Sequence, residues 1–154
     1  MFVYSSEMAS GLLSDEAEAE GKIAIGGEFG YGEAVSRKGV LHAYEGVKNL
    51  LRHYGHLNEP VKRIDPACEC GPRLVSAQDV QAYVPAPCDG IWEPSVDLGE
   101  AVSEGTVIGH LHDFSDYEAE ALEIRAQREG VVIMMHSPAQ CTRGVTLYVI
   151  AREV

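Results

Sequence analysis

Glu28 stands in the most glycine-rich stretch of the chain, and its surroundings suggest chemistry. Four of the seven residues in Gly26-Gly27-Glu28-Phe29-Gly30-Tyr31-Gly32 are glycine, which allows unusual backbone angles and close approach of a ligand. The preceding Lys22-Ile23-Ala24-Ile25 predicts a short strand, and ligand sites of α/β sheets lie at the carboxyl ends of strands. Glu28 therefore stands where a ligand site is expected. The alternative interpretation is a solvated loop carboxylate.

Two pairs of residues have spacings found in metal sites. His110 and His112 alternate on a predicted strand, so their rings share a face and could chelate a metal, although no third ligand stands at a recognisable spacing. They are therefore weak candidates. His42 and Glu45 spell H-x-x-E, but both fall on the polar side of a predicted helix, which favours a solvated surface.

The elements around Glu28 predict a short α/β unit. Ser14 and the acidic run after it predict the start of a helix, and Gly21 predicts its end. A second helix is expected from about Ser36 to Tyr54, with Gly55 just beyond its end. Its apolar residues fall in one arc when plotted at the helical period, so we expect it to pack one face on a sheet. These residues are Val40, Leu41, Tyr44, Val47, Leu50, Leu51 and Tyr54.

The chain changes character after this unit. Residues 58–78 contain three prolines and predict an extended linker, and short β-rich runs follow from residue 79. A weak repeat is visible there, because Ala86 to Ile91 lines up with Ala126 to Val131 forty residues later. Two such halves predict a flattened β-barrel that resembles the hammerhead of biotinyl and lipoyl carrier domains. A swinging-arm carrier is excluded, since the chain has no Lys after Lys62 to be acylated.

Composition limits the classes of function. The 154 residues carry a net charge of -12, which argues against binding to nucleic acid or to an anionic membrane. No apolar run approaches a transmembrane length, and no signal peptide is readable. Four cysteines, including the Cys68-Glu69-Cys70 pair, are too few for a disulfide framework and lack the partner pair of a structural zinc site. We therefore expect a cytoplasmic protein.

The order of these features resembles one known family. A strand that ends in Gly-Gly-Glu28-Phe-Gly, a helix that ends in Leu50-Leu-Arg-His-Tyr-Gly55, and a carrier-like barrel without its Lys together resemble the C-terminal part of the succinylglutamate desuccinylase/aspartoacylase family. The resemblance extends over essentially the whole chain. It is closest to members linked to ectoine use, which act on N-acetyl diaminobutyrate. It implies a zinc-carboxypeptidase-like α/β piece in residues 1–57 and a barrel-sandwich module in residues 79–154.

The resemblance also implies a reaction and a site. Members of the family remove an acyl group from an N-acyl amino acid with a zinc-activated water, and Glu28 matches the glutamate that serves as general base. Arg37 and Tyr31 are weaker candidates for binding the substrate. The family's zinc ligands, an H-x-x-E pair and a later His, precede the glycine-flanked strand and would lie before Met1. We therefore expect no complete zinc site in this chain and no activity from the chain alone.

A piece of a sheet would leave an edge and an apolar helix face to cover. We therefore expect either a homo-oligomer or a complementing N-terminal half. The alternative function is a non-catalytic β-module that assembles subunits or binds a partner, and metal content distinguishes the two.

Overall fold

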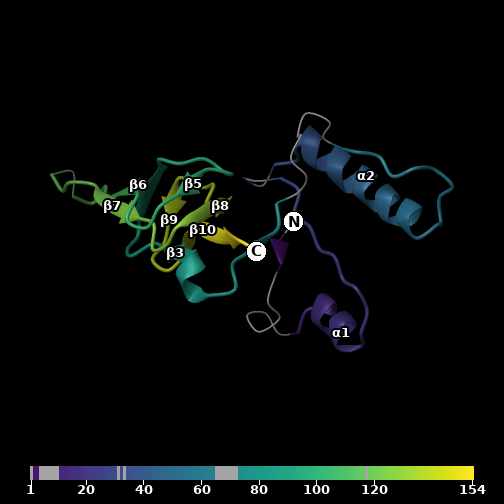
Figure 1. Ribbon diagram of the computed structural model, residues 1–154. Coiled ribbons are helices and arrows are strands. Elements are labelled where there is room, and N and C mark those ends of the chain that lie inside the picture. The colour runs from purple at the N-terminus through teal and green to yellow at the C-terminus, as the bar shows by residue number, and fades with distance from the viewer. Residues whose placement is uncertain (1, 4–10, 31, 33, 65–72, 117) are drawn as a thin grey trace. The chain divides into compact units, whose positions relative to one another are not determined.

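A computed structural model describes residues 2–3, 11–30, 32, 34–64, 73–116 and 118–154. The chain forms two compact units (Figure 1). One comprises Ala9–Gly71 and is called the helical unit here; the other comprises Met1–Met8 with Pro72–Val154 and is called the β unit. The predicted boundaries at residues 57 and 78 stay predictions.

The helical unit contains α1 (Leu13–Ala19) and α2 (Arg37–His53). The prediction for α2 is confirmed: the Ser36 hydroxyl accepts a hydrogen bond from the Gly39 N–H at 2.8 Å, and Gly55 has a φ of +75° just past the C-cap. The prediction that Ser14 caps α1 was wrong. The N-cap is Leu12, two residues earlier, and the Asp15 carboxylate accepts its N–H at 3.1 Å.

The strand expected at residues 22–25 is not formed. The segment is extended without strand assignment, and residues 23–29 make no backbone hydrogen bond to any described residue. A strand needs a neighbour to satisfy its N–H and C=O groups, and the described part of this unit has none to offer. The local pattern of Ile23 and Ile25 was therefore not sufficient to form a strand.

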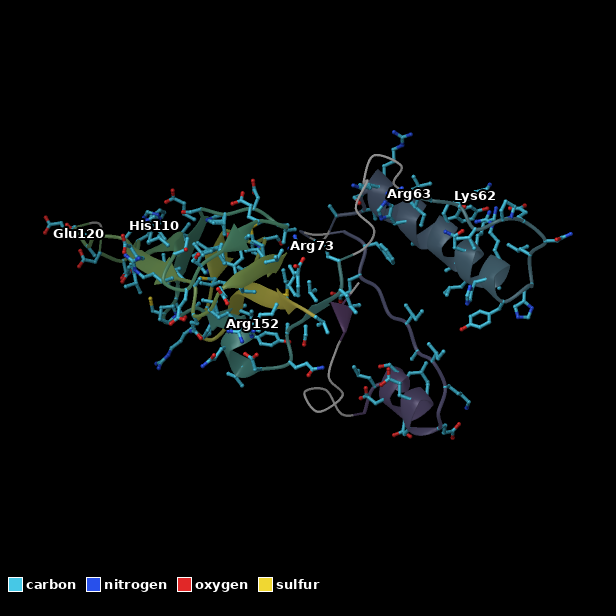
Figure 2. All side chains as sticks on the ribbon, in the orientation of Figure 1. Lys62, Arg63, Arg73, His110, Glu120 and Arg152 are labelled. Atoms are coloured by element: carbon cyan, nitrogen blue, oxygen red, sulfur yellow. The ribbon has the colours of Figure 1, made fainter. Side chains whose placement is uncertain are left out.

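The segment after α2 returns along the polar side of the helix. The Asn49 side chain accepts the Lys62 N–H at 2.9 Å and donates to the Lys62 carbonyl at 2.7 Å, so one amide binds both backbone groups of a single residue. Figure 2 shows Lys62 on this returning segment beside α2. Residues 56–63 are called the strap below.

Ten strands and one 3-10 turn are described outside the two helices. β1 pairs with β2 in parallel, and all the other strand pairs in the described part of the chain are antiparallel. The elements are β1 (Phe2–Val3), β2 (Val75–Ser76), η2 (Val80–Ala82), β3 (Tyr83–Pro85), β4 (Gly90–Pro94), β5 (Ala101–Val102), β6 (Val107–His112), β7 (Leu122–Arg125), β8 (Gly130–Met135), β9 (Gln140–Cys141) and β10 (Thr146–Glu153).

The sequence repeat corresponds to two sheets with the same order of strands. One sheet contains β3-β10-β8-β5 and is extended by β2 and β1 beside β10; the other is β7-β6-β4-β9. Equivalent strands occupy equivalent places when the second half is shifted by about forty residues. The backbone bonds repeat as well: Gly144 N–H donates to the Ala86 carbonyl and Gly105 N–H to the Ala126 carbonyl, both at 2.8 Å. The repeat therefore reflects an internal structural duplication.

The main core lies between these two sheets. Both halves contribute fully buried side chains, with Ile108 on β6 and Leu147 on β10 at equivalent positions of the repeat. β10 is buried along most of its length, because Val149 and Ala151 point into a second cluster with Val75, Ala77 and Ala82. This explains why β10 reads as a continuous apolar run rather than an alternating one. Among the described residues, no helix is both long and apolar enough to cross a membrane.

Candidate functional site

Glu28 is held by a backbone that packs on the first turn of α2. A Cβ at Gly39 would lie 2.8 Å from the Phe29 carbonyl oxygen and 2.7 Å from the Ser36 hydroxyl. Only a glycine in the first turn therefore lets the chain pass so close to the helix. Gly30, with a φ of +137°, lies next to this contact. Gly39 and Gly30 therefore allow the backbone at Phe29, the residue after Glu28, to lie against the start of α2.

The Glu28 side chain is exposed, and no hydrogen bond or ion pair joins it to a described residue. An unpaired carboxylate on a glycine-flanked segment can accept a proton from a bound water. Arg37 begins α2 and is also exposed, but no described contact brings it to Glu28. Tyr31 lies outside the described residues. The described structure leaves Glu28 exposed and unpaired, and the roles of all three residues stay predictions.

His110 and His112 lie on β6, where neighbouring strands surround them with glutamates. His112 Nε2 lies 2.6 Å from a carboxylate oxygen of Glu93 on β4. His110 pairs in register with Glu93 on one side and with Glu123 on the other. Figure 2 marks His110 in this part of the β unit. Cross-strand partners share a face of the sheet, so the two histidines stand among carboxylates at the surface.

The described residues do not fit a zinc ion. No group of three or more His, Cys, Asp or Glu side chains within them could hold a metal. The Glu93 carboxylate is bonded to His112, and the Glu123 carboxylate is paired with Arg125. Cys68 and Cys70 lie outside the described residues. The described residues therefore supply no metal to the reaction proposed for this chain.

The sequence pattern missed a charged network on the polar face of α2. The Arg52 side chain is completely buried, although it lies on the polar side of the helix. Its guanidinium donates to Glu59 from Nε at 3.2 Å and Nη2 at 2.8 Å, and from Nη1 to Glu45 at 3.1 Å and Asn49 at 2.9 Å. The spacing of Glu45, Asn49 and Arg52 on one helix face was the available signal. Glu45 is thus an ion-pair partner of Arg52, and His42 lies on the same half-buried side.

The Arg52 hydrogen bond lowers the pKa of Glu59 below its ordinary value, with help from the positive charges of Lys48 and Arg52. The same hydrogen bond raises the pKa of Arg52. Both shifts favour the charged pair. The network holds the strap in place and is structural, because it lies on the opposite side of α2 from the apolar arc.

One shallow depression opens on the β unit. It lies between the turn at 87–90, the loop at 113–115 and Arg143. Ser115 donates through its hydroxyl and its backbone N–H to Asp113, which lowers the pKa of that carboxyl. Cys88 beside it is an exposed free thiol, while Cys141 is buried and burial raises its thiol pKa. Asp89 accepts the Arg143 N–H at 2.7 Å, so the polar groups there mainly serve the turns.

Known proteins match this arrangement over most of the chain. The N-alpha-acetyl-L-2,4-diaminobutyric acid deacetylase of Halomonas elongata is 30% identical over 147 residues, which is 95% of this chain and 42% of the deacetylase. The crystal structure of a succinylglutamate desuccinylase/aspartoacylase from Rhodobacter sphaeroides has a TM-score of 0.88 at 27% identity and covers 99% of this chain. The chain resembles part of a succinylglutamate desuccinylase/aspartoacylase protein. The resemblance expected from the sequence is thus confirmed.

The match covers nearly all of this chain but only part of each succinylglutamate desuccinylase/aspartoacylase protein. The chain spans less than half the length of the relatives it matches, 42% of the deacetylase and 45% of the Rhodobacter sphaeroides structure. The ectoine utilization protein EutE (DoeB) from Ruegeria pomeroyi shares the fold, with a TM-score of 0.87 over 98% of this chain and 45% of its own. No family model matches the chain.

Proposed function

We propose that this chain is part of a zinc-dependent amidohydrolase that removes the acyl group from an N-acyl amino acid. One observation carries the proposal: the match to the Halomonas elongata deacetylase covers 95% of the chain, and so includes the glycine-flanked Glu28. The substrate of that relative makes N-acetyl-2,4-diaminobutyrate the first compound to test. A cytoplasmic location and a substrate role for Arg37 and Tyr31 remain parts of this proposal.

Glu28 is the general base in this proposal. Its carboxylate takes a proton from the attacking water, whose oxygen bonds to the acyl carbon, and the protonated Glu28 then delivers this proton to the departing amine nitrogen. The C–N bond breaks, and the products are a carboxylic acid and an amine; the acid then passes its remaining proton to the amine or to water. The exposed, unpaired state of Glu28 supports this role, because no internal ion pair must be broken first. Zinc would be held by residues other than those described here.

The β unit supports a second part of the proposal. Its duplicated sheets and buried core suggest a barrel-sandwich module, which would help to assemble the enzyme. A complementing N-terminal half, or a second copy of the chain in a homo-oligomer, is the partner in this proposal. A non-catalytic β-module that binds a partner is the alternative, favoured by the fact that the β unit has a separate core.

A chimera tests the proposal. This chain replaces the matched part of the Halomonas elongata deacetylase, and the release of acetate from N-acetyl-2,4-diaminobutyrate is measured beside the zinc content. We expect the chimera to bind zinc and to hydrolyse the substrate, and the chain alone to do neither. Glu28→Gln in the chimera should lower kcat by about 10² to 10⁴-fold, whereas Glu18→Gln on α1 should leave it unchanged.

Two results would contradict the proposal. Full activity of the Glu28→Gln chimera would remove Glu28 from the mechanism. One tightly held zinc per chain with hydrolysis by the chain alone would show that His110, His112 or His42 with Glu45 form a site that the described geometry does not contain.

A further inference from the structure

Two cysteines of the β unit lie on neighbouring segments. Cys88 is exposed in the turn before β4, and Cys141 is buried on β9. Gly90, two residues after Cys88, is the register partner of Cys141. The same two segments also meet on the other side of Cys88, where the Ala86 carbonyl accepts the Gly144 N–H at 2.8 Å. Cys88 is therefore held between two points at which its segment contacts the segment that carries Cys141.

The two sulfur atoms influence each other. Burial raises the pKa of the Cys141 thiol, and the negative charge of a Cys88 thiolate raises it further. Such an interaction requires short range, because charges farther apart are screened by water and salt. Cys141 belongs to the core between the sheets, whereas Cys88 lines the shallow depression. The pair thus combines a sulfur that solvent reaches with a protected sulfur close behind it.

The duplicated half has the same backbone without the thiols. Val102 on β5 is the register partner of Gly130, as Cys141 is of Gly90. Val102 is buried in the same core, so a small apolar side chain is all that packing requires at position 141. The place of Cys88 is taken in the other half by the buried Arg128. Packing therefore explains a small residue at 141 and does not explain a second thiol beside it.

We propose that Cys88 and Cys141 are a reversible redox pair that a low-molecular-weight disulfide, such as glutathione disulfide, converts to an intramolecular disulfide. The Cys88 thiolate attacks one sulfur of the small disulfide, whose S–S bond breaks, and the released thiolate takes up the proton that Cys88 lost. Cys141, as a thiolate, then attacks the Cys88 sulfur, and the second small thiol leaves with the Cys141 proton. Two protein thiols are oxidised, and one small disulfide is reduced to two thiols.

The second step needs Cys141 to be reached, and β9 allows this. β9 has only two residues and lies at the edge of its sheet, where β4 is its neighbour. A short edge strand opens locally more readily than the interior of a sheet. The new bond would join β9 to the turn before β4 and prevent this opening. In a reducing compartment such a pair is reduced at rest and oxidised transiently. The inference does not rest on the proposed function.

Oxidation of the chain tests the pair directly. The chain with Cys68→Ser and Cys70→Ser, which lacks the other two thiols, is incubated with glutathione disulfide, and its remaining thiols are alkylated after denaturation. We expect a monomer that has lost two hydrogen atoms, takes up no alkylating agent and gives a peptide pair joined through Cys88 and Cys141 in mass spectrometry. Dithiothreitol should restore both thiols.

Two further variants of this chain separate a pair from two independent thiols. Cys141→Val copies Val102 at the equivalent position of the repeat, so it should keep the core intact. Oxidation of this variant should stop at a stable mixed disulfide of glutathione with Cys88. Cys88→Ser should leave Cys141 reduced, because the buried thiol has no accessible sulfur to attack.

Hydrogen exchange measures the effect of the bond on β9. The Trp92 N–H donates to the carbonyl of Ala139, just before β9, at 2.7 Å. Oxidation should slow exchange at the Trp92 amide by more than about tenfold, because β9 no longer opens. Val132 is the matched control, since its N–H donates to the Glu100 carbonyl at 2.9 Å at the equivalent place in the other half. Its exchange should not change.

Three products would overturn the inference. They are a stable mixed disulfide on Cys88 in the chain that retains Cys141, a disulfide between two chains, and an unreacted chain. Equal exchange at the Trp92 amide in the reduced and oxidised chains would overturn the predicted effect on β9.

Discussion

The guanidinium of Arg52 binds the carboxylate of Glu59 through two nitrogens, Nε at 3.2 Å and Nη2 at 2.8 Å. The two residues lie seven positions apart, one on α2 and one on the strap, and the Arg52 side chain is fully buried. A planar guanidinium can serve Glu59, Glu45 and Asn49 at once because its donors point in fixed, divergent directions. Arg52 and Asn49 together therefore hold the strap against the polar face of α2.

Arg52→Lys should release the strap. A lysine ammonium keeps the charge but cannot reproduce the forked contact with Glu59 while also reaching Glu45 and Asn49. We expect faster hydrogen exchange at the Lys62 amide, which is bonded to Asn49, and lower thermal stability of the helical unit. Arg125→Lys is the control, since Arg125 pairs with Glu123 at the exposed surface of β7. Unchanged exchange at Lys62 in the Arg52→Lys chain would show that Asn49 alone holds the strap.

The strap should also loosen in acid. The pKa of Glu59 is lower in the folded chain than its ordinary value of 4.5, so the unfolded form binds a proton first. The stability from this pair is therefore complete above about pH 4.5 and is lost as the pH falls through the lower folded pKa. Exchange at the Lys62 amide, corrected for its intrinsic pH dependence, should increase in this acidic range. Glu59→Gln should remove the pH dependence, and its persistence in that variant would assign it to another carboxylate.

The sequence predicted correctly those features that depend on residues close together in the chain, such as helix ends and repeated turns. Ser36 and Gly55 bound α2 as expected, because capping depends on residues within the same few turns. The repeat around Gly90 and Gly130 predicted two equivalent halves, because each half repeats the same turns and strands. The glycines next to Glu28 are a local signal of the same kind, but the role of Glu28 stays a prediction.

The features that failed depend on partners far along the chain. Arg52 is buried because the strap brings Glu59 to it, and nothing in the helical period reveals that return. Ile23 and Ile25 form no strand without a neighbouring sheet. His112 was a candidate ligand, but the register of β4 against β6 brings Glu93 to its ring, and registers across a sheet could not be read from the spacing of His110 and His112.

Gly109→Ala should displace the only tryptophan. A Cβ at Gly109 on β6 would lie 2.2 Å from Cη2 of Trp92 and 2.6 Å from the Glu93 carbonyl oxygen, and the indole is buried in the core between the sheets. Overpacking of this kind costs about 1–3 kcal/mol. We expect a shifted Trp92 emission maximum and a lower urea midpoint. Gly46→Ala on α2 has open space around the new methyl and should leave the emission unchanged. Native emission in the Gly109→Ala chain would contradict this packing.

Tyr148→Phe should change how the β unit responds to alkali. The buried Tyr148 hydroxyl donates to the Val96 carbonyl at 2.7 Å, and burial raises the pKa of Tyr148 to about 12. The phenol ionises more readily in the unfolded chain, with an ordinary pKa of 10.0, so its contribution to stability is complete below pH 10 and declines towards pH 12. Loss of the hydrogen bond should cost about 1 kcal/mol at neutral pH.

The deficit of the Tyr148→Phe chain should therefore shrink as the pH rises from 10 to 12. Urea unfolding followed by the emission of Trp92 measures it, because this ring packs edge to face on Tyr148 with centroids 5.5 Å apart. Tyr44→Phe, on the exposed apolar side of α2, should show no difference from the original chain at any pH. A deficit in the Tyr148→Phe chain that stays constant from pH 7 to 12 would mean that this phenol ionises equally well in the folded and unfolded chains. It would contradict the raised pKa of Tyr148.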